Sequence, residues 1–335
     1  IDEEAGIDGV GRRHLQCLDC GKKWVSSEYA GNGFSYHGKL SVDGPDLVDQ
    51  NGNKFQLYGL STHGLQWFNR YVNFESFYNI QKEFGINVIR LSLYPDEGGY
   101  SDCDQQYKDF LFNVVCTGIE ACIELDMYVI LDWHMLGSNL HKADALDVFQ
   151  RISEKYKEHD NIIYEIMNEP YGSITWNDCK QYAIEAIQTI RANQPDAVVL
   201  VGSPKYSTDL ASIYSNPLSM FRNIMYTYHF YAASHRSQYN TVESYYNKGL
   251  PIFISEHGGM EATGDGPMNY QSVGKWYETL DRLNISYVAW NISNSKGSAS
   301  ILISGIDGQT FADDTLKEWG KYYKTVTRTK ANLDS

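Results

Sequence analysis

Residues 162–204 read IIYEIMNEPYGSITWNDCKQYAIEAIQTIRANQPDAVVLVGSP, and this stretch decides the fold. It begins with a short apolar run that ends in polar residues at Asn168 and Glu169. An amphipathic segment follows at 176–194, and a second apolar run, VVLVGSP, begins at residue 198. A strand, a helix and a second strand in this order are typical of a βαβ unit, in which the two strands are parallel and buried.

The same rhythm recurs along the chain from residue 55 onward. Helix-like segments, for example at 105–126, 176–194 and 268–283, separate the apolar runs. Such alternation predicts a single closed (β/α)8 barrel (a TIM barrel) rather than an open sheet, which would usually carry a glycine-rich phosphate turn after its first strand. Eight runs are candidate strands: 55–62, 88–94, 128–134, 162–170, 198–204, 224–231, 252–259 and 287–293.

Length, composition and charge narrow the class of protein. A chain of 335 residues is long for one domain, but single α/β barrels commonly reach this length. The sequence contains no apolar run of about 18 residues or more, so it predicts no membrane span. A formal net charge of −14 disfavours nucleic acid and anionic polysaccharides as partners. The 26 tyrosines offer flat apolar faces with polar tips, which suit sugar rings.

We expect two regions in the chain. Residues 1–30 are polar and include a dibasic Arg12-Arg13, and we interpret them as an N-terminal extension packed on the barrel. Residues 31–335 are expected to form the catalytic barrel. Within them, residues 40–53 are expected to form a hairpin that covers the bottom of the barrel, with its turn at Asp49-Gln50-Asn51-Gly52.

Six cysteines are compatible with disulfides in an oxidising compartment. Cys17-x-x-Cys20 has no second C-x-x-C, so it is at best half of a zinc site. Cys116 and Cys122 lie on one predicted helix and point to different faces, so we do not expect them to pair. The chain begins with Ile, and we expect a secreted, extracellular protein whose signal has been removed or left out.

Polar residues stand at the carboxyl ends of most of the predicted strands. In a barrel these ends converge on one mouth, where active sites form. One polar residue after an apolar run is more often a solvated loop residue, but six or more such ends among eight are poorly explained by chance. The residues at these ends are Arg90, His134, Asn168, Glu169, His229, Phe230, Tyr231, Glu256, His257 and Trp290.

Two glutamates fall on opposite sides of the expected mouth. Glu169 lies in Ile166-Met167-Asn168-Glu169-Pro170, and Glu256 lies in Ile254-Ser255-Glu256. Hydrolysis of a glycosidic bond needs one carboxylic acid to protonate the leaving oxygen and one carboxylate to attack the anomeric carbon. Structural ion pairs are the alternative for each glutamate taken alone. Together the two glutamates favour a glycosidase.

Several stretches resemble glycoside hydrolase family 5, and in particular its bacterial-type endoglucanases, which are cellulases. The resemblance covers residues 38–325 and involves all eight strand ends in order. Asn-Glu-Pro alone is only moderately specific, whereas the ordered set is strongly specific. The stretches are GLSTHGLQW at 59–67, VIRL at 88–91, VILDWH at 129–134, NEP at 168–170, Glu256, and WNIS at 290–293.

The resemblance implies a role for each polar residue at the mouth. Glu169 would be the general acid/base, and Glu256 would be the nucleophile. Arg90 beneath Glu256 would keep it ionised, and Tyr231 would add a hydrogen bond. Asn168 would hydrogen-bond the 2-hydroxyl of the sugar, a contact that strengthens in the transition state. Two histidines complete the set: His229 beside Glu169 and His134 beside the glycone sugar.

The resemblance also implies which residues bind sugar. Trp290, Trp67 and Tyr94 would form a stacking platform on the glycone side, with His63 beside them. Two positions depart from the family. Lys296 follows Trp290 at a longer spacing and lacks its usual acidic companion, and Tyr206 stands where the family often has tryptophan.

The function that the resemblance implies is endo-acting hydrolysis of β-1,4-glucosidic bonds in cellulose and related β-glucans. The reaction would retain configuration through a covalent glycosyl-enzyme, in a monomer without a metal or other cofactor that binds β-glucan or cello-oligosaccharides. A mannanase, xyloglucanase or mixed-linkage glucanase on the same barrel stays open, because the carboxylates would be identical. A non-catalytic carbohydrate-binding protein is disfavoured, because both glutamates and Arg90 are present. A metal hydrolase using His63, His134 and His229 is disfavoured, because the H-E-x-x-H and facial-triad spacings are absent.

Overall fold

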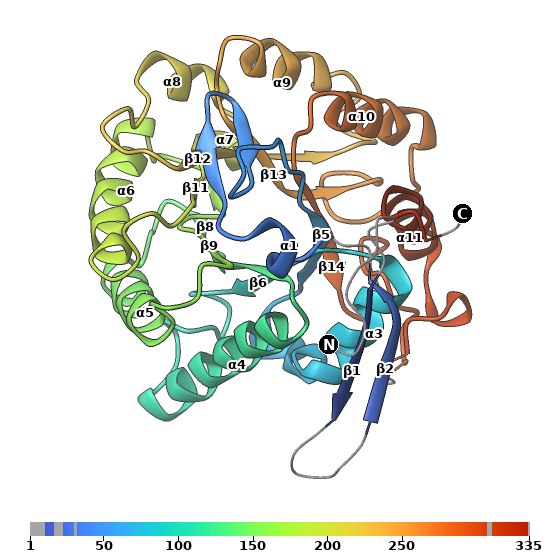
Figure 1. The fold of residues 1–335 in the computed structure, drawn as a ribbon. Helices are drawn as coiled ribbons and strands as arrows, with labels where there is room; N and C mark the ends of the chain where they lie inside the picture. Colours follow the sequence, from blue (N-terminus) through green and yellow to red (C-terminus); the bar gives the residue numbers. More distant parts are fainter. Residues whose placement is uncertain (1–10, 17–22, 30–31, 307–309, 334–335) are drawn as a thin grey trace.

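A computed structural model describes residues 11–16, 23–29, 32–306 and 310–333 of the chain. Within the expected extension, β1 (Gly11–Gln16) and β2 (Lys23–Tyr29) pair as an antiparallel hairpin. Figure 1 shows this hairpin outside the ring of helices, next to α3 (Phe74–Phe84). Cys17 and Cys20, and any zinc or disulfide role for them, lie outside the described residues.

Eight parallel strands close into a barrel, which confirms the predicted (β/α)8 fold (Figure 1). Each of the eight predicted apolar runs contains one of these strands. The last strand pairs with the first, so the sheet has no free edge. In order, the strands are β5 (Tyr58–Thr62), β6 (Val88–Leu93), β7 (Tyr128–Trp133), β9 (Ile162–Glu165), β11 (Val199–Val201), β12 (Ile224–Tyr231), β13 (Ile252–Gly258) and β14 (Tyr287–Ile292).

Helices surround the barrel and bury their apolar faces against the strands (Figure 1). In α6 a capping box starts the helix, because Thr175 accepts from the backbone of Asp178 while the Asp178 carboxylate accepts from Thr175. Buried residues then recur at the helical period along its inner face. The longer helices are α3, α4 (Gln105–Glu124), α5 (Lys142–Lys155), α6 (Trp176–Arg191), α9 (Tyr239–Tyr246), α10 (Tyr270–Arg282) and α11 (Glu318–Lys330).

Shorter elements fill the connections between strands and helices. The two-residue strands β8 (Leu136–Gly137) and β10 (Glu169–Pro170) pair in parallel above the barrel, so they bring the loops after β7 and β9 together. The others are α1 (Phe34–His37), α2 (Leu65–Phe68), η1 (Asn69–Tyr71), α7 (Pro204–Ser207), α8 (Leu210–Ser215) and η2 (Asp313–Thr315).

The predicted floor hairpin is present, but its turns differ from the expectation. The strands β3 (Ser41–Asp43) and β4 (Asp46–Val48) are joined at Gly44-Pro45, where Gly44 adopts φ +58°, a conformation that glycine accepts without strain. The turn predicted at residues 49–52 is a second one, which leads into a bridge between Val48 and Lys54. The apolar side chains of this segment pack under the barrel as a second, smaller core.

Four cysteines fall in the described residues, and all four carry free thiols. Cys116 and Cys122 are both buried in α4 and do not pair with each other, as predicted. Burial also raises the pKa of Cys179 to about 12, so this thiol stays protonated. Among the described helices, none is both long enough and apolar enough to cross a membrane.

Candidate active site

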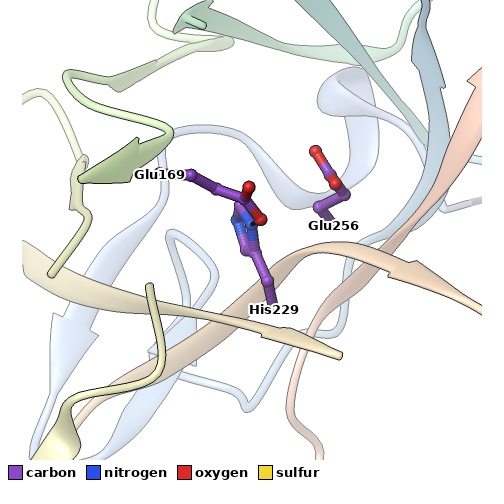
Figure 2. Close-up of side chains that lie close together, drawn as sticks. All are labelled: Glu169, His229 and Glu256. Carbon is purple, nitrogen blue, oxygen red and sulfur yellow. Dashed lines mark hydrogen bonds and ion pairs between the residues drawn. The ribbon is translucent and has the colours of Figure 1, made fainter. Parts of the chain in front are cut away.

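The polar residues predicted at the mouth gather at the carboxyl ends of the barrel strands. In the pairing of β12 with β13, His229 lies directly opposite Glu256. Glu169 comes from β10, where it leaves the barrel wall after Asn168. One carboxylate oxygen of each glutamate and one ring nitrogen of His229 lie within 4.8 Å of one another. Figure 2 shows these three side chains directed toward the same space.

Glu256 is held from two sides. The phenol of Tyr231 donates a hydrogen bond to Oε1 at 2.8 Å, and Nη1 of Arg90 donates to Oε2 at 3.3 Å. Burial and the charge of Glu256 raise the pKa of Tyr231 well above its usual value, so the phenol keeps its proton and remains a donor. Both contacts stabilise a negative charge on Glu256.

Arg90 is fully buried at the centre of this cluster. Its guanidinium forms a bidentate pair with Glu165, with Nε to Oε2 at 2.7 Å and Nη2 to Oε1 at 3.1 Å. Nη2 also donates to Oδ1 of Asn168 at 2.7 Å and lies 3.1 Å from Oδ2 of Asp132. The planar fork of arginine suits such contacts, so Arg90 fixes the positions of several acceptors at once.

Glu165 was not predicted as a site residue, yet it links Arg90 to His229. Ser255 bridges them, since its hydroxyl donates to Oε1 of Glu165 at 2.7 Å and lies 2.9 Å from Nε2 of His229. Burial alone would raise the pKa of Glu165, but the charges of Arg90 and His229 lower it to about 2. A carboxylate within the apolar run IIYEIM was the available signal, because a buried charge needs a partner.

His229 contacts acceptors through both ring nitrogens. Nδ1 lies 2.8 Å from Oε1 of Glu169, and Nε2 faces Ser255. Burial alone would lower its pKa, but contacts with Glu165 and Glu169 and the charge of Glu256 raise it to about 10. His229 is therefore a cation that donates from both nitrogens near neutral pH.

This protonation can be tested directly by side-chain ¹⁵N NMR. At pH 7 and pH 8 we expect two protonated ring nitrogens for His229. Because burial lowers the pKa of both His134 and His257 to about 3, each should show one. Since the pKa of His229 is raised above its ordinary value of 6.5, its charge stabilises the fold below about pH 6.5, and this contribution is lost as the pH rises toward 10. Deprotonation of His229 between pH 6 and 8 would contradict this assignment.

The same protonation decides how well the site suits a metal ion. Glu169, His229 and Glu256 are the group of potential ligands close enough to share an ion in the described part of the chain. A metal requires a neutral imidazole with a free lone pair, so the raised pKa of His229 disfavours an ion at this position. Within the described residues, His63, His134 and His229 do not form a group of potential metal ligands.

His134 and Asp132 form a second buried pair next to Arg90. Nδ1 of His134 lies 2.6 Å from Oδ2 of Asp132. Burial and the nearby Arg90 lower the pKa of His134, while burial raises the pKa of Asp132. Both shifts favour the uncharged form of each group, while the charge of Arg90 opposes the shift of Asp132. The ring of His134 stacks between Tyr94 at 4.2 Å and Trp290 at 5.0 Å between ring centroids.

An aromatic wall extends from this stack toward solvent. His63 contacts Trp67 and Trp290, with ring centroids 5.5 and 5.1 Å apart, and Trp67 packs edge-on against Tyr94 at 5.2 Å. Trp67 is 40% exposed, whereas Trp290 and Tyr94 are mostly buried. The free surface of the wall is therefore largely that of Trp67.

Two of the predicted sugar-binding residues lie apart from this wall. Lys296 is exposed in the loop after β14, outside the contacts described above. Tyr206, in α7, lines a cavity of about 500 Å³ together with Glu169, His229 and Tyr231. Cavities of this size commonly hold small ligands or parts of larger ones. The site is thus an open cleft with the two glutamates between an aromatic wall and this cavity.

A closed (β/α)8 barrel with two adjacent glutamates at its mouth and an aromatic wall beside them defines a glycoside hydrolase. Sequence comparison identifies the family within this class. The chain belongs to the cellulase family, glycosyl hydrolase family 5, whose sequence profile matches residues 48–296.

Proteins named as endoglucanases are similar to this chain, in agreement with this family. The chain is 42% identical over 292 residues to Endoglucanase A of Butyrivibrio fibrisolvens, covering 85% of this chain and 67% of that protein. It is 38% identical over 276 residues to an endoglucanase of Clostridium saccharobutylicum, covering 81% of this chain but only 60% of that protein. The catalytic domain of Thermobifida fusca endoglucanase Cel5A, in complex with cellotetraose, matches with a TM-score of 0.80 and 31% identity, covering 88% of this chain and 99% of that one.

Proposed function

We propose that this chain hydrolyses internal β-1,4-glucosidic bonds of cellulose and related β-glucans with retention of configuration. The separation of Glu169 and Glu256 carries the proposal, since an oxygen of each lies within 4.8 Å of the other. Retaining glycosidases hold their two carboxyl groups about 5–5.5 Å apart, whereas inverting enzymes leave about 6.5–9.5 Å for a water molecule. The short separation supports direct attack by a carboxylate.

The surroundings of the two glutamates support different roles for them. Glu256 accepts hydrogen bonds from Tyr231 and Arg90, which favour the anion that attacks the anomeric carbon. Glu169 borders the cavity and is more accessible than Glu256, as a group must be that exchanges protons with a leaving oxygen and then with water. In the first step Glu169 protonates the leaving oxygen while Glu256 forms an ester with the sugar. In the second step Glu169 takes a proton from the water that hydrolyses this ester.

Asn168 supports binding of the sugar beside Glu256. Its Oδ1 is fixed by Arg90, and its buried Nδ2 has no hydrogen-bond partner in the described part of the protein. An unsatisfied buried amide is costly, so this donor suits a substrate group. A 2-hydroxyl adjacent to the reacting carbon fits the position, because its hydrogen bond strengthens as positive charge develops on the ring.

The wall and the cavity support a polymeric, uncharged substrate. The exposed ring of Trp67 offers a flat face for a glucose unit, and the strongly acidic net charge disfavours uronic acids. One structural neighbour binds cellotetraose. A polysaccharide cannot enter a cell, so this function implies a secreted protein. One chain carries both glutamates and the residues that contact them, so it can act as a monomer.

The substrate is tested by reducing-sugar release from amorphous cellulose, lichenan, xyloglucan and mannan measured side by side. We expect rapid release from the two unbranched glucans and much slower release from mannan. Proton NMR of the products should show the β-anomer before mutarotation, because two inversions give net retention. Faster hydrolysis of mannan would reject the β-glucan assignment, and an initial α-anomer would reject the double displacement.

A further inference from the structure

The loop that follows β14, residues 293–300, is held by a single ammonium group from another part of the chain. Three consecutive carbonyl groups of this β14 loop are directed at Nζ of Lys317. Nζ donates to all three oxygens, at 2.6 Å for Ser295, 3.2 Å for Lys296 and 2.7 Å for Gly297. An ammonium has three N–H donors and no acceptor, so its donors match the three carbonyl oxygens in number.

This arrangement depends on the positive charge of Lys317. Carbonyl dipoles directed at one point repel one another, and a cation between them offsets that repulsion. Hydrogen bonds from a charged donor are also roughly twice as strong as those between neutral groups. Burial lowers the pKa of Lys317, but the charge of Asp265 opposes this shift. Asp265 contacts the β14 loop as well, since its Oδ1 accepts from the amide of Ser298 at 3.0 Å.

The start of α11, which follows Lys317, holds β14 and its loop at further points. Nε1 of Trp319 donates to the carbonyl oxygen of Trp290 at 2.8 Å, and the amide of Lys317 donates to the carbonyl oxygen of Ile301 at 2.8 Å. A Cβ atom at Gly320 would lie 2.6 Å from the carbonyl oxygen of Ile301, so a side chain at this position would clash. The helix therefore fits closely against the strand, and the backbone of Lys317 has a fixed place beside the loop.

The hydrogen bonds to Lys317 also restrain the side chain of Lys296. A peptide group is planar, so a carbonyl group with a fixed direction restrains its whole peptide unit. The carbonyl groups of Ser295 and Lys296 belong to the peptide units on the two sides of the Lys296 Cα atom. Restraining both units leaves little freedom in φ and ψ, and the direction of the Cα–Cβ bond follows. Lys296 itself is exposed, in the loop that leaves the barrel mouth after the strand of Trp290.

We propose that Lys317 is a positioning residue for the glucan, because its ammonium fixes the β14 loop so that Lys296 can hydrogen-bond a sugar hydroxyl beside the aromatic wall. The inference rests on the proposed β-glucan hydrolysis, since that function places a sugar beside Trp290. Lys317 does not itself contact the sugar, because the loop uses its three N–H groups. Loss of Lys317 should therefore weaken substrate binding and leave the two glutamates in place.

The first test is the KM and kcat of Lys317→Ala on cellohexaose. We expect KM to rise by roughly threefold to tenfold, because a hydrogen bond from a charged group is weakened rather than removed. The kcat should change by less than about twofold, since a contact made equally with substrate and transition state affects binding alone. KM does not depend on how much of the variant is folded. As a control, Lys321→Ala replaces the exposed lysine one turn further along α11 and should leave both constants unchanged.

Chemical rescue separates the cation from the side chain that carries it. Lys317→Ala removes three carbon atoms and the ammonium, and propylammonium supplies the same atoms. Added at high millimolar concentration, propylammonium should lower the KM of Lys317→Ala toward that of the unmodified protein. Tetramethylammonium carries the same charge but has no N–H donor, so it should leave the raised KM unchanged.

A double-mutant cycle shows whether Lys317 acts through Lys296. Lys296→Met removes the proposed sugar contact and should raise KM by itself. In this background Lys317→Ala should raise KM by less than about twofold, because two residues that act through one contact are not additive.

The possible outcomes distinguish this inference from the function on which it rests. An unchanged KM in Lys317→Ala, an equal rise in Lys321→Ala, or equal effects of the two ammonium ions would refute the positioning role while the hydrolase stands. Failure of propylammonium to lower KM, or full additivity with Lys296→Met, would refute it as well. If the unmodified protein cuts no cello-oligosaccharide, the proposed function itself fails.

Discussion

Replacement of Glu256 by alanine should reduce hydrolysis of cellohexaose by on the order of 10⁵-fold, because the first step of a double displacement needs this nucleophile. The truncated side chain leaves space on the face of the sugar opposite the leaving group. Azide can occupy that space and attack an activated β-aryl cellobioside once, which inverts the anomeric carbon. The expected product is the α-glycosyl azide, identified by NMR.

A surface glutamate provides the control for this variant. Glu278 is exposed on α10 and pairs with Lys275, so Glu278→Ala should retain nearly all activity and gain no azide product. If Glu256→Ala kept more than a small fraction of the activity without azide, Glu256 would not be the nucleophile. The same would follow if the azide product were the β-anomer.

Replacement of Glu169 by alanine should reduce hydrolysis of cellohexaose by about 10²–10⁴-fold, because the sugar leaving group requires protonation. Formation of the glycosyl-enzyme from an aryl glycoside with a good leaving group should suffer much less. The intermediate then accumulates, and azide attacks it from the side that Glu169 vacated. The product is the β-glycosyl azide, opposite to that of Glu256→Ala.

Comparison of the two substrates decides this second assignment. Equal losses on cellohexaose and on the aryl glycoside would show that Glu169 does not act as an acid. The α-azide from this variant would indicate that the two glutamates exchange roles. Each variant thus serves as the stereochemical reference for the other.

The barrel could be predicted from the sequence because its signal is distributed over the whole chain. Each buried parallel strand is a short run of Val, Ile and Leu, and each run is followed by a segment with helical periodicity. The predicted ends of the strands were less accurate. The run at 162–170 divides into β9 and β10, and the run at 198–204 contains only the short strand β11, because Pro204 starts α7.

The site was predictable only where a residue type reveals its chemistry. Glutamate after a strand is conspicuous, whereas Ser255 gains its importance from a neighbour on another strand. Glu165 was hidden for the same reason, since its partner Arg90 is 75 positions away. Tyr171 stacks on Tyr206 from a different segment of the chain, and the positive φ of Tyr206 is not signalled by its residue type.

The buried chain from Arg90 through Glu165 and Ser255 to His229 has a consequence for the reaction cycle. Arg90 and His229 are cations and Glu165 is an anion, so together they supply one unbalanced positive charge. In the proposed mechanism the balancing negative charge is carried before the reaction by Glu256, the nucleophile beside Arg90. In the proposed mechanism Glu256 becomes an uncharged ester and Glu169 gives up its proton, so the balancing charge then resides on Glu169, beside His229. In the proposed cycle the negative charge thus moves from Glu256 to Glu169 without a change in the net charge of the cluster.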